Sequence, residues 1–430
     1  MGLKGAKMSI LKTEVRDSYK ETRIGMIPAE WDVVKVKDVI TSHKQGFYTN
    51  KNYSENGGIK LVRITDLLNP KLNYESMPSL DVDNKTFEQF KVDLGDFLVA
   101  RSGAIGRYGI ALNKSPCIFG SYIIRFRLDQ CKIDNYFFGL LYESSYILGQ
   151  LARITQGSSN ININAENIKS MWIPRPPLYE QQKIVVMLSS VDATIEKTDA
   201  IIAQMEWMKE ALMQELFTKG IGHAEFKETK VGKIPKEWDL KKLSDLAEII
   251  MGQSPSGATY NALQCGKPLI NGPVEFGIKY PTPIQWTSEP IKLCKPGDIL
   301  FCVRGSTTGR MNLADQEYCI GRGIAAIRGR SNLACTSFIL YLLKYKNHNI
   351  YKTALGGGST FPNITSAQLQ KYLCVFPNFA EQCRIGSTLS FIDEKIEHER
   401  IYSKQLASLR KGLMQDLLTG KVRVTEDAHA

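Results

Sequence analysis

A chain of 430 residues is long enough for two or more domains, each with its own core. Its hydrophobic content of 43% and charged content of 23% are ordinary for a soluble globular protein. The formal net charge of +11 favours an acidic partner, and nucleic acid, an anionic membrane surface and solubility alone are the open explanations. No stretch has the apolar length of a signal peptide or a membrane span, so we expect a cytoplasmic protein.

The first recognisable element is a short segment that occurs twice. Residues 19–32 read YKETRIGMIPAEWD, and residues 226–239 read FKETKVGKIPKEWD. Such dense matches, placed at the same distance before each of two globular stretches, indicate an internal repeat. The fixed place of Trp31 and Trp238 in an Ile-Pro-x-Glu-Trp motif favours a structural anchor over a base-stacking platform.

Each globular stretch then carries a Gly-Asp turn, a short β-strand and a glycine-rich loop with arginines. The first copy reads LGDFLVARSG from Leu94 and reaches Arg107; the second reads PGDILFCVRG from Pro296 and reaches Arg310. Short β-type runs begin at Ile59 and Ser121, and helices are expected at residues 135–149 and 336–344. The sequence therefore predicts a strand-rich α/β (α+β) domain, used twice.

Each half ends in a long amphipathic helix, at residues 179–219 and 380–420. Apolar positions at alternating steps of four and three form one stripe, which needs a partner because a long solvated helix is not stable alone. The two stripes are predicted to form the helix interface, through Ile184, Leu188, Val191, Ile195, Ile202, Leu212, Leu216, Ile385, Leu389, Ile392, Ile396, Leu406, Leu413 and Leu417. The halves should then be related by a pseudo-twofold axis.

Catalytic and metal-binding patterns are missing from the sequence. The nine cysteines include no Cys-x-x-Cys pair, and the five histidines show no metal or triad spacing. There is no [DNS]-P-P-[YFW] segment for amino-methylation and no nucleotide-binding glycine loop. We expect no enzyme activity, no cofactor and no metal ion in this chain.

The duplicated order of these motifs resembles the specificity subunit of type I restriction–modification enzymes. The Ile-Pro-x-Glu-Trp segment, the Gly-Asp strand-loop motif and the Glu-Gln start of each long helix all recur, and the similarity covers residues 19–422. The expected division is an N-terminal tail at 1–18, recognition domains at 19–176 and 222–377, spacer helices at 177–221 and 378–421, and a C-terminal tail at 422–430.

The resemblance implies a DNA-reading subunit without catalysis of its own. Each domain would bind one half of a split, asymmetric site in double-stranded DNA, while the helices pair as an antiparallel coiled coil that fixes the gap. The helices would also dock two methylation subunits, and restriction/translocase subunits would join for cleavage. S-adenosylmethionine, ATP and magnesium would belong to those partner subunits.

Candidate DNA contacts come from arginines and from loops in which the two copies differ. Arginine suits both guanine and phosphate, and Arg101, Arg107 and Arg125 have Arg304, Arg310 and Arg322 as expected rough counterparts. The loops are rich in Ser, Asn, Gln and Tyr, although an ordinary turn explains each of them as well. The full set of candidates is Lys44, Tyr48, Arg101, Ser102, Arg107, Ser158, Asn160, Gln253, Ser254, Tyr260, Arg304, Arg310, Arg322, Ser359 and Thr360.

A rival hypothesis remains at this point. A non-catalytic coiled-coil scaffold, whose globular heads bind protein or a membrane surface, would share the same helices and the same lack of active-site motifs. The two hypotheses differ in DNA affinity, which should fall steeply with salt if the chain contacts phosphates.

Overall fold

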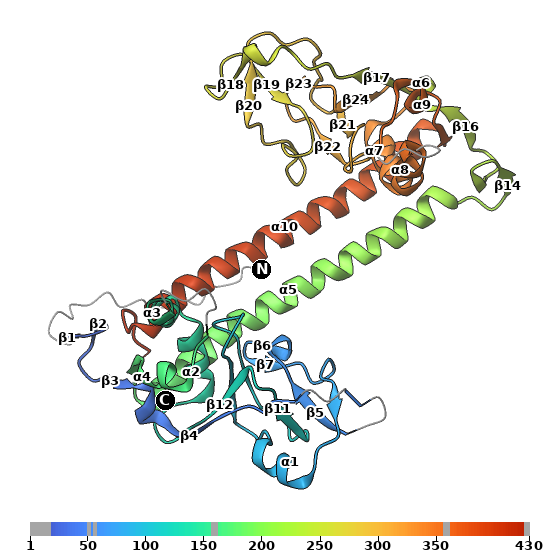
Figure 1. The fold of residues 1–430 in the computed structure, drawn as a ribbon. Helices are drawn as coiled ribbons and strands as arrows, with labels where there is room; N and C mark the ends of the chain where they lie inside the picture. The colour runs from blue at the N-terminus through green and yellow to red at the C-terminus, as the bar shows by residue number, and fades with distance from the viewer. Residues whose placement is uncertain (1–18, 50–52, 55–57, 156–161, 356–361, 425–430) are drawn as a thin grey trace, which may run out of the picture. The chain divides into compact units, whose positions relative to one another are not determined.

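The computed structural model describes residues 19–49, 53–54, 58–155, 162–355 and 362–424. The chain divides into two compact units, one formed by residues 1–197 and 403–430 and the other by residues 198–402. Each long helix contributes to both units, and the ribbon in Figure 1 follows the chain through its elements. The units are described separately below.

Unit 1 is built around two β-sheets. The antiparallel sheet has the order β10-β9-β12-β4, and the second sheet has the order β11-β5-β8 with β11 and β5 parallel. Its strands are β4 (Ile40–Gln45), β5 (Ile59–Val62), β8 (Ser79–Leu80), β9 (Phe97–Ala100), β10 (Tyr108–Ile110), β11 (Cys117–Phe119) and β12 (Ile123–Leu128). Two-stranded pairs complete it: β1 (Tyr19–Thr22) with β2 (Gly25–Pro28), β3 (Asp32–Lys35) with β13 (Trp172–Arg175), and β6 (Leu67–Leu68) with β7 (Lys71–Leu72).

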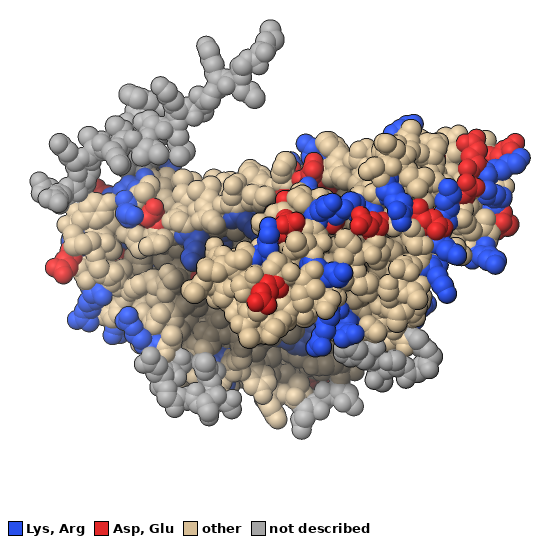
Figure 2. Space-filling view, turned by 90° about the horizontal axis from the view of Figure 1, so that it is seen from above, with Lys and Arg blue, Asp and Glu red and all other residues tan. Residues whose placement is uncertain are grey.

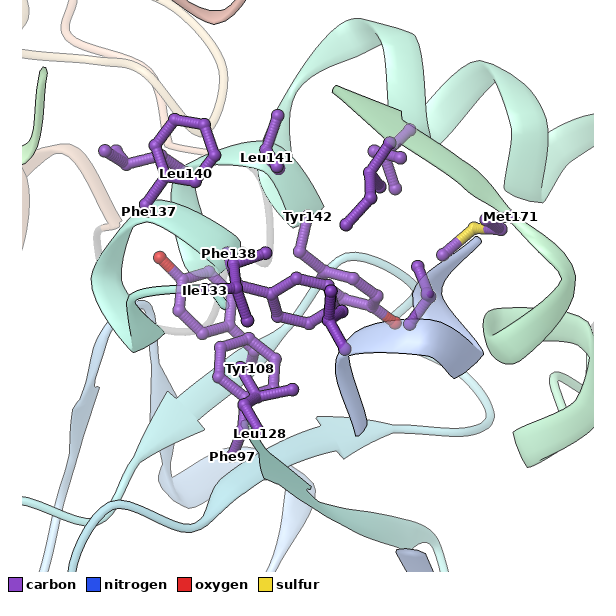
Figure 3. Close-up of a cluster of buried hydrophobic side chains, with 14 of the residues drawn as sticks. Phe97, Tyr108, Leu128, Ile133, Phe137, Phe138, Leu140, Leu141, Tyr142 and Met171 are labelled. Atoms are coloured by element: carbon purple, nitrogen blue, oxygen red, sulfur yellow. The ribbon is translucent and has the colours of Figure 1, made fainter. Parts of the chain in front are cut away.

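The side chains of β9 contribute to two hydrophobic cores, because successive side chains point to opposite faces of a strand. Phe97 and Val99 join the core beneath the helices, whereas Leu98 and Ala100 join the core against the second sheet. Figure 3 shows Phe97 and Tyr108 gathered with Phe138 on the helix side. The ring centroids of Phe97 and Tyr108 lie 5.0 Å apart in a stacked arrangement.

The helices of unit 1 are α1 (Asn84–Phe90), α2 (Asn135–Glu143), α3 (Ser145–Thr155), α4 (Ala165–Ser170) and the first part of α5 (Leu178–Thr218). Asp134 caps α2 by accepting a hydrogen bond from the Phe137 backbone at 2.9 Å, which satisfies one of the free N–H groups of the first turn. The single helix expected at residues 135–149 is in fact two, because Ser144 ends α2 in an extended conformation.

Unit 2 repeats this plan with a different second sheet. The antiparallel sheet β17-β24-β21-β22 contains β17 (Ala247–Met251), β21 (Ile299–Cys302), β22 (Met311–Leu313) and β24 (Ile324–Gly329). The second sheet, β18-β20-β19-β23, contains β18 (Tyr260–Asn261), β19 (Lys267–Ile270), β20 (Gln285–Thr287) and β23 (Cys319–Ile320). The pairs β14 (Phe226–Thr229) with β15 (Gly232–Pro235) and β16 (Asp239–Lys242) with β25 (Leu373–Phe376) complete the strands, and the helices are α6 (Leu243–Leu246), α7 (Thr336–Tyr345), α8 (Asn347–Leu355), α9 (Ser366–Gln370) and part of α10 (Phe379–Leu418).

The two long helices pair through ion pairs as well as apolar contacts. In unit 1, Asp192 of α5 pairs with Arg410 of α10. In unit 2, Lys209 of α5 pairs with Asp393 of α10, and Glu206 with Arg400, so the helices run antiparallel there. None of the predicted interface residues is exposed: Ile184, Leu188, Leu216, Ile385, Leu389, Ile392, Ile396 and Leu417 are buried, and Val191, Ile195, Ile202, Leu212, Leu406 and Leu413 are half-buried.

The duplicated motifs contact one another. Trp31 is fully buried, and its indole N–H donates to the carboxylate of Glu180, at the start of α5, at 2.8 Å. Trp238 donates in the same way to Glu381, at the start of α10, at 3.1 Å. The predicted structural role of both tryptophans is therefore confirmed.

The segment that follows each long helix contributes a side chain to the buried Trp–Glu pair at the start of the other long helix. After α10, Arg423 donates to Glu180 at 2.8 Å, so the Trp31–Glu180 pair in unit 1 becomes a triad. After α5, the ring of His223 lies 3.0 Å from Glu381 in unit 2. Each triad joins a repeat to the helix end supplied by the other half of the sequence.

The glutamine after each of these glutamates fixes the helix start to its domain. Gln181 accepts the backbone N–H of Asp134, just before α2, at 2.9 Å and donates to the carbonyl of Pro176 at 2.8 Å. Gln382 makes the matching bonds to Cys335 and Pro377. The Glu-Gln motif is thus the point at which each long helix is attached to a strand-rich domain.

Candidate nucleic-acid interface

The loops that carry the candidate residues of unit 2 meet at one edge of its sheets. Gly252, directly after β17, donates its backbone N–H to Ile324 at 2.8 Å, and Gln253 donates to Ile320 at 2.9 Å. A Cβ atom at Gly252 would lie 2.2 Å from the carbonyl oxygen of Gly321, so this close approach of two backbones requires glycine. The loops after β17, β19, β21 and β23 therefore lie together.

Four of the predicted contact residues of unit 2 surround one hollow at this edge. Its volume is about 480 Å³, and Ser254, Tyr260, Arg304 and Arg322 line it together with Asn271. Gln253 is exposed and adjacent in sequence, whereas Arg310 does not line the hollow. The structure thus brings together residues that are up to 68 positions apart in the chain, such as Ser254 and Arg322.

Arg304 and Arg322 line the hollow. Their backbones are held in place, while their side chains stay exposed. The hydroxyl of Ser254 accepts the backbone N–H of Arg322 at 3.1 Å. Arg304 forms an isolated β-bridge with Asn363, and Gly305 donates to Pro362 at 2.9 Å. Within the described part of the chain, neither guanidinium has an ion pair with an acidic side chain, so both are available to an anionic or acceptor-rich ligand.

Arg107 and Arg310 occupy matching positions in the two units. Val99 pairs with Tyr108 in one sheet, and Phe301 pairs with Met311 in the other. Arg107 therefore lies directly before β10, and Arg310 lies directly before β22. Gly106 and Gly309, which precede them, have φ values of +90° and +91°, a backbone conformation that favours glycine. Both arginine side chains are exposed.

In unit 1, Lys44 and Tyr48 flank the equivalent edge. Lys44 is half-buried on β4, and its ammonium lies 4.6 Å from the centroid of the Phe90 ring. Tyr48 follows the strand and is 74% exposed. Tyr48 is the more accessible of the two for a ligand.

The strand register corrects the expected pairing of the arginines. Ala100 and Cys302 pair with Ile123 and Ile324, so Ser102, not Arg101, matches Arg304. The bridges Ser102–Asn162 and Arg304–Asn363 agree with that match. Arg101 is half-buried, and its Nε atom has no hydrogen-bond partner in the described structure.

Arg125 was expected as a DNA contact and a counterpart of Arg322, and both expectations are wrong. It lies within β12, 8% exposed, with its guanidinium 3.5 Å from Asp96 and hydrogen-bonded to the Lys91 carbonyl. Burial lowers its pKa. The residue that matches Arg322 is Ser121, because Gly120 and Gly321 bond to the ends of equivalent strands.

The Gly-Asp motif turns out to have a structural role. Asp96 accepts the backbone N–H of Asp93 at 2.8 Å and pairs with Arg127 at 2.8 Å. Asp298 binds Arg328 at 2.6 Å in the same way. Hydrogen bonds to these buried carboxylates raise the pKa of both arginines.

Some candidates lie outside the described residues, and the lining residues Asn271, Gly272, Pro273 and Gly323 were missed. Ser158, Asn160, Ser359 and Thr360 fall in the first group. Asn271 was not predicted, although its place directly after a short apolar strand gave the same signal as the loops that were chosen.

On the face shown in Figure 2, lysine and arginine side chains occur beside acidic ones and do not merge into one uniform patch. The described residues contain no group of three or more His, Cys, Asp or Glu that could hold a metal ion. None of the helices described here is both long and apolar enough to cross a membrane.

Comparisons with known proteins agree on one family. The model described as "Type I restriction modification DNA specificity domain" matches residues 28–206 and again residues 235–406. The "Putative type I restriction enzyme MjaX specificity subunit" of Methanocaldococcus jannaschii is 32% identical over 426 residues, covering 96% of this chain and 99% of that protein.

Two solved structures share the fold. A chain from a type I restriction–modification system, solved to explain complex assembly and conformational transition, has a TM-score of 0.59 at 24% identity and covers 92% of this chain and 99% of its own. The S subunit of such a system from M. genitalium has a TM-score of 0.59 at 16% identity, with coverage of 92% and 97%.

The duplicated strand-rich domains, the paired helices and the family matches define a DNA target-recognition protein. The chain belongs to the family of type I restriction–modification DNA specificity proteins. It is a specificity subunit and is not itself catalytic, and the cofactors of the system belong to the methylation and restriction subunits. The scaffold hypothesis is thereby set aside.

Proposed function

We propose that each strand-rich domain, at residues 19–176 and 222–377, reads one half of a bipartite, asymmetric target in double-stranded DNA. The observation that carries the proposal is the hollow of unit 2, where Ser254, Tyr260, Arg304 and Arg322 converge from separate loops. A concave site with fixed donors and acceptors suits the edge of a base pair. The corresponding loops of unit 1 carry different side chains, so the two half-sites should differ.

The candidate contacts divide between readout and anchoring. Arg107 and Arg310, which are exposed and occupy matching positions, suit phosphate, because contacts to phosphate position a protein without specifying sequence. In unit 1, Lys44, Tyr48, Arg101 and Ser102 are the proposed contacts, and in unit 2 Gln253 joins the residues of the hollow. Ser158, Asn160, Ser359 and Thr360 remain proposed contacts from the sequence alone.

The two long helices, at residues 177–221 and 378–421, would set the gap between the half-sites and dock two methylation subunits. Large apolar side chains exposed on them support a protein partner, notably Trp207 at 72% and Phe391 at 59%. Restriction/translocase subunits would join that complex in the cytoplasm. S-adenosylmethionine, ATP and magnesium would act in those partners.

The test is an adenine-methylation map of the host genome with the gene intact and with the gene deleted. Loss of one split, asymmetric motif on deletion supports the proposal and gives both half-sites and the gap. A map that does not change, combined with purified chain that binds no duplex DNA at low salt, would overturn it.

A further inference from the structure

The hollow of unit 2 has a counterpart position by position in unit 1, and the chemistry of the two differs. Equivalent backbone hydrogen bonds, such as Gly46 to Ile123 and Gly252 to Ile324, fix the correspondence of the loops. Ser102 stands where unit 2 has Arg304, and Ser121 stands where unit 2 has Arg322. A shared scaffold therefore presents two arginines in one unit and two serines in the other.

Positions that are kept and positions that change have different meanings in a duplicated DNA-binding protein. Both copies must bind the same phosphate backbone, and a matched pair such as Arg107 and Arg310 fits that common task. Each copy reads its own bases, so readout belongs to the positions that differ. Arg304 and Arg322 are the largest such difference on the described part of this edge.

The other residues that line the hollow favour a base edge over a phosphate group. A phosphate accepts hydrogen bonds through all of its oxygens and needs only donors. The hollow also offers groups that can accept, namely the hydroxyls of Ser254 and Tyr260 and the amide oxygen of Asn271. A G·C pair presents two acceptors on guanine and one donor on cytosine in the major groove, and this combination matches the mixed lining.

In unit 1 the positions that correspond to Ser254 and Asn271 also carry different side chains. Arg63, which corresponds to Asn271, is bound to Asp66 at 3.0 Å and to the carbonyl of Ser76 at 2.6 Å, so its guanidinium is occupied within the domain. Tyr48, which corresponds to Ser254, is exposed. Unit 1 thus has no free arginine fork at the positions of Arg304 and Arg322.

We propose that Arg304 and Arg322 determine specificity in the second domain by reading a G·C base pair, and that the first domain lacks this readout. The inference rests on the proposed function, because it assumes that this edge faces the DNA. It predicts at least one G·C pair in the half-site of the second domain whose recognition depends on these two arginines.

The experiment combines methylation maps with arginine variants in the intact complex of the host strain. R304A, R304K, R322A and R322K are each introduced, and R310K serves as the matched control at the kept position. Lysine preserves the charge but replaces the rigid planar fork by a flexible ammonium, so a phosphate contact should survive the change, whereas discrimination at a guanine should weaken. Recognition of the first half-site in the same cells reports whether the subunit is folded and assembled.

The expected result is reduced base discrimination at one position of the second half-site. At least one of R304K and R322K should lower discrimination at one G·C pair of the second half-site by about 5- to 150-fold, while the first half-site stays unchanged. R310K should leave every position of the motif as in the wild type. The alanine variants should relax the same position as the lysine variants.

Three outcomes would overturn the inference while leaving the proposed function standing. These are a second half-site without any G·C pair, lysine variants that keep the full motif, and variants that reduce methylation evenly at all positions. Failure of the proposed function looks different, because the wild-type strain would then show no split motif that depends on the gene.

Discussion

The buried carboxylate of Glu180 is the most informative single group to remove from unit 1. Its side chain is fully buried, and it accepts hydrogen bonds from Trp31 at 2.8 Å and from Arg423 at 2.8 and 3.1 Å. Burial lowers the pKa of Arg423, but the bonds to Glu180 and Glu30 outweigh burial and raise it, so the arginine stays charged. Glu180→Ala therefore leaves a buried indole N–H without its acceptor and leaves Arg423 with Glu30 as its remaining carboxylate partner.

The expected loss follows from these contacts. Breaking a buried charge pair by removing one partner costs about 3–5 kcal/mol, which includes about 1–3 kcal/mol for the unsatisfied donor. For a unit of this size each kcal/mol lowers the melting temperature by about 2–4 °C, so the transition of unit 1 should fall by about 6–20 °C. Glu180→Gln keeps one acceptor for Trp31 and should cost about 1–2 kcal/mol.

Scanning calorimetry of the purified chain measures this effect. Glu196→Ala is the matched control, since it removes a glutamate from the same helix whose partner Lys71 is 61% exposed. That change should leave the transition almost unmoved, because exposed ion pairs contribute little. If Glu180→Ala melted together with the control, the Trp31–Glu180–Arg423 triad would not be a major source of stability.

Three further predictions concern other parts of the molecule. Gly252→Ala places a Cβ 2.2 Å from the Gly321 carbonyl and should destabilise unit 2 by about 1–3 kcal/mol in thermal unfolding, whereas Gly257→Ala, which has open space around it, should be neutral. Lys344→Glu puts a carboxylate where an ammonium now lies 3.4 Å from Asp393, so unit 2 should melt earlier than with the exposed control Lys352→Glu, and equal melting would refute the role of that pair. Insertion of about one helical turn within residues 200–209 should lengthen the gap in the methylation map, and altered half-sites would contradict the division of labour proposed here.

The long helices were predictable because their signal is local and repeated. Residues 179–219 and 380–420 were expected, and the structure has Leu178–Thr218 and Phe379–Leu418. Periodicity over ten turns averages out local ambiguity, and the proline before each helix marks its start. The burial of Trp31 could be predicted for a similar reason, since its motif is copied at Trp238.

The partners of these residues could not be predicted, because they depend on contacts between distant segments. Trp31 meets Glu180 across 149 positions, and no local pattern indicates that separation. Arg125 was misread because an arginine on a strand looks exposed until the register shows Asp96 beneath it. Ser102 already aligns with Arg304 when the two Gly-Asp motifs are placed letter by letter, but matching arginine to arginine suggested the neighbouring Arg101, and the pairing of β9 with β12 corrects it.

Unit 1 is formed by two segments that lie far apart in the sequence, and this has a consequence for its folding during translation. Its core includes Met414, Leu417 and Leu418, which are translated after all of unit 2, and these residues pack with Ile184 and Leu188. Domains usually fold in the order in which they are synthesised. Here the domain that emerges first must wait for the last helix, while unit 2 has all of its residues by position 402. The nascent first domain therefore keeps an open apolar seam while the whole of unit 2 is synthesised, and unit 2 is the first to reach its finished form.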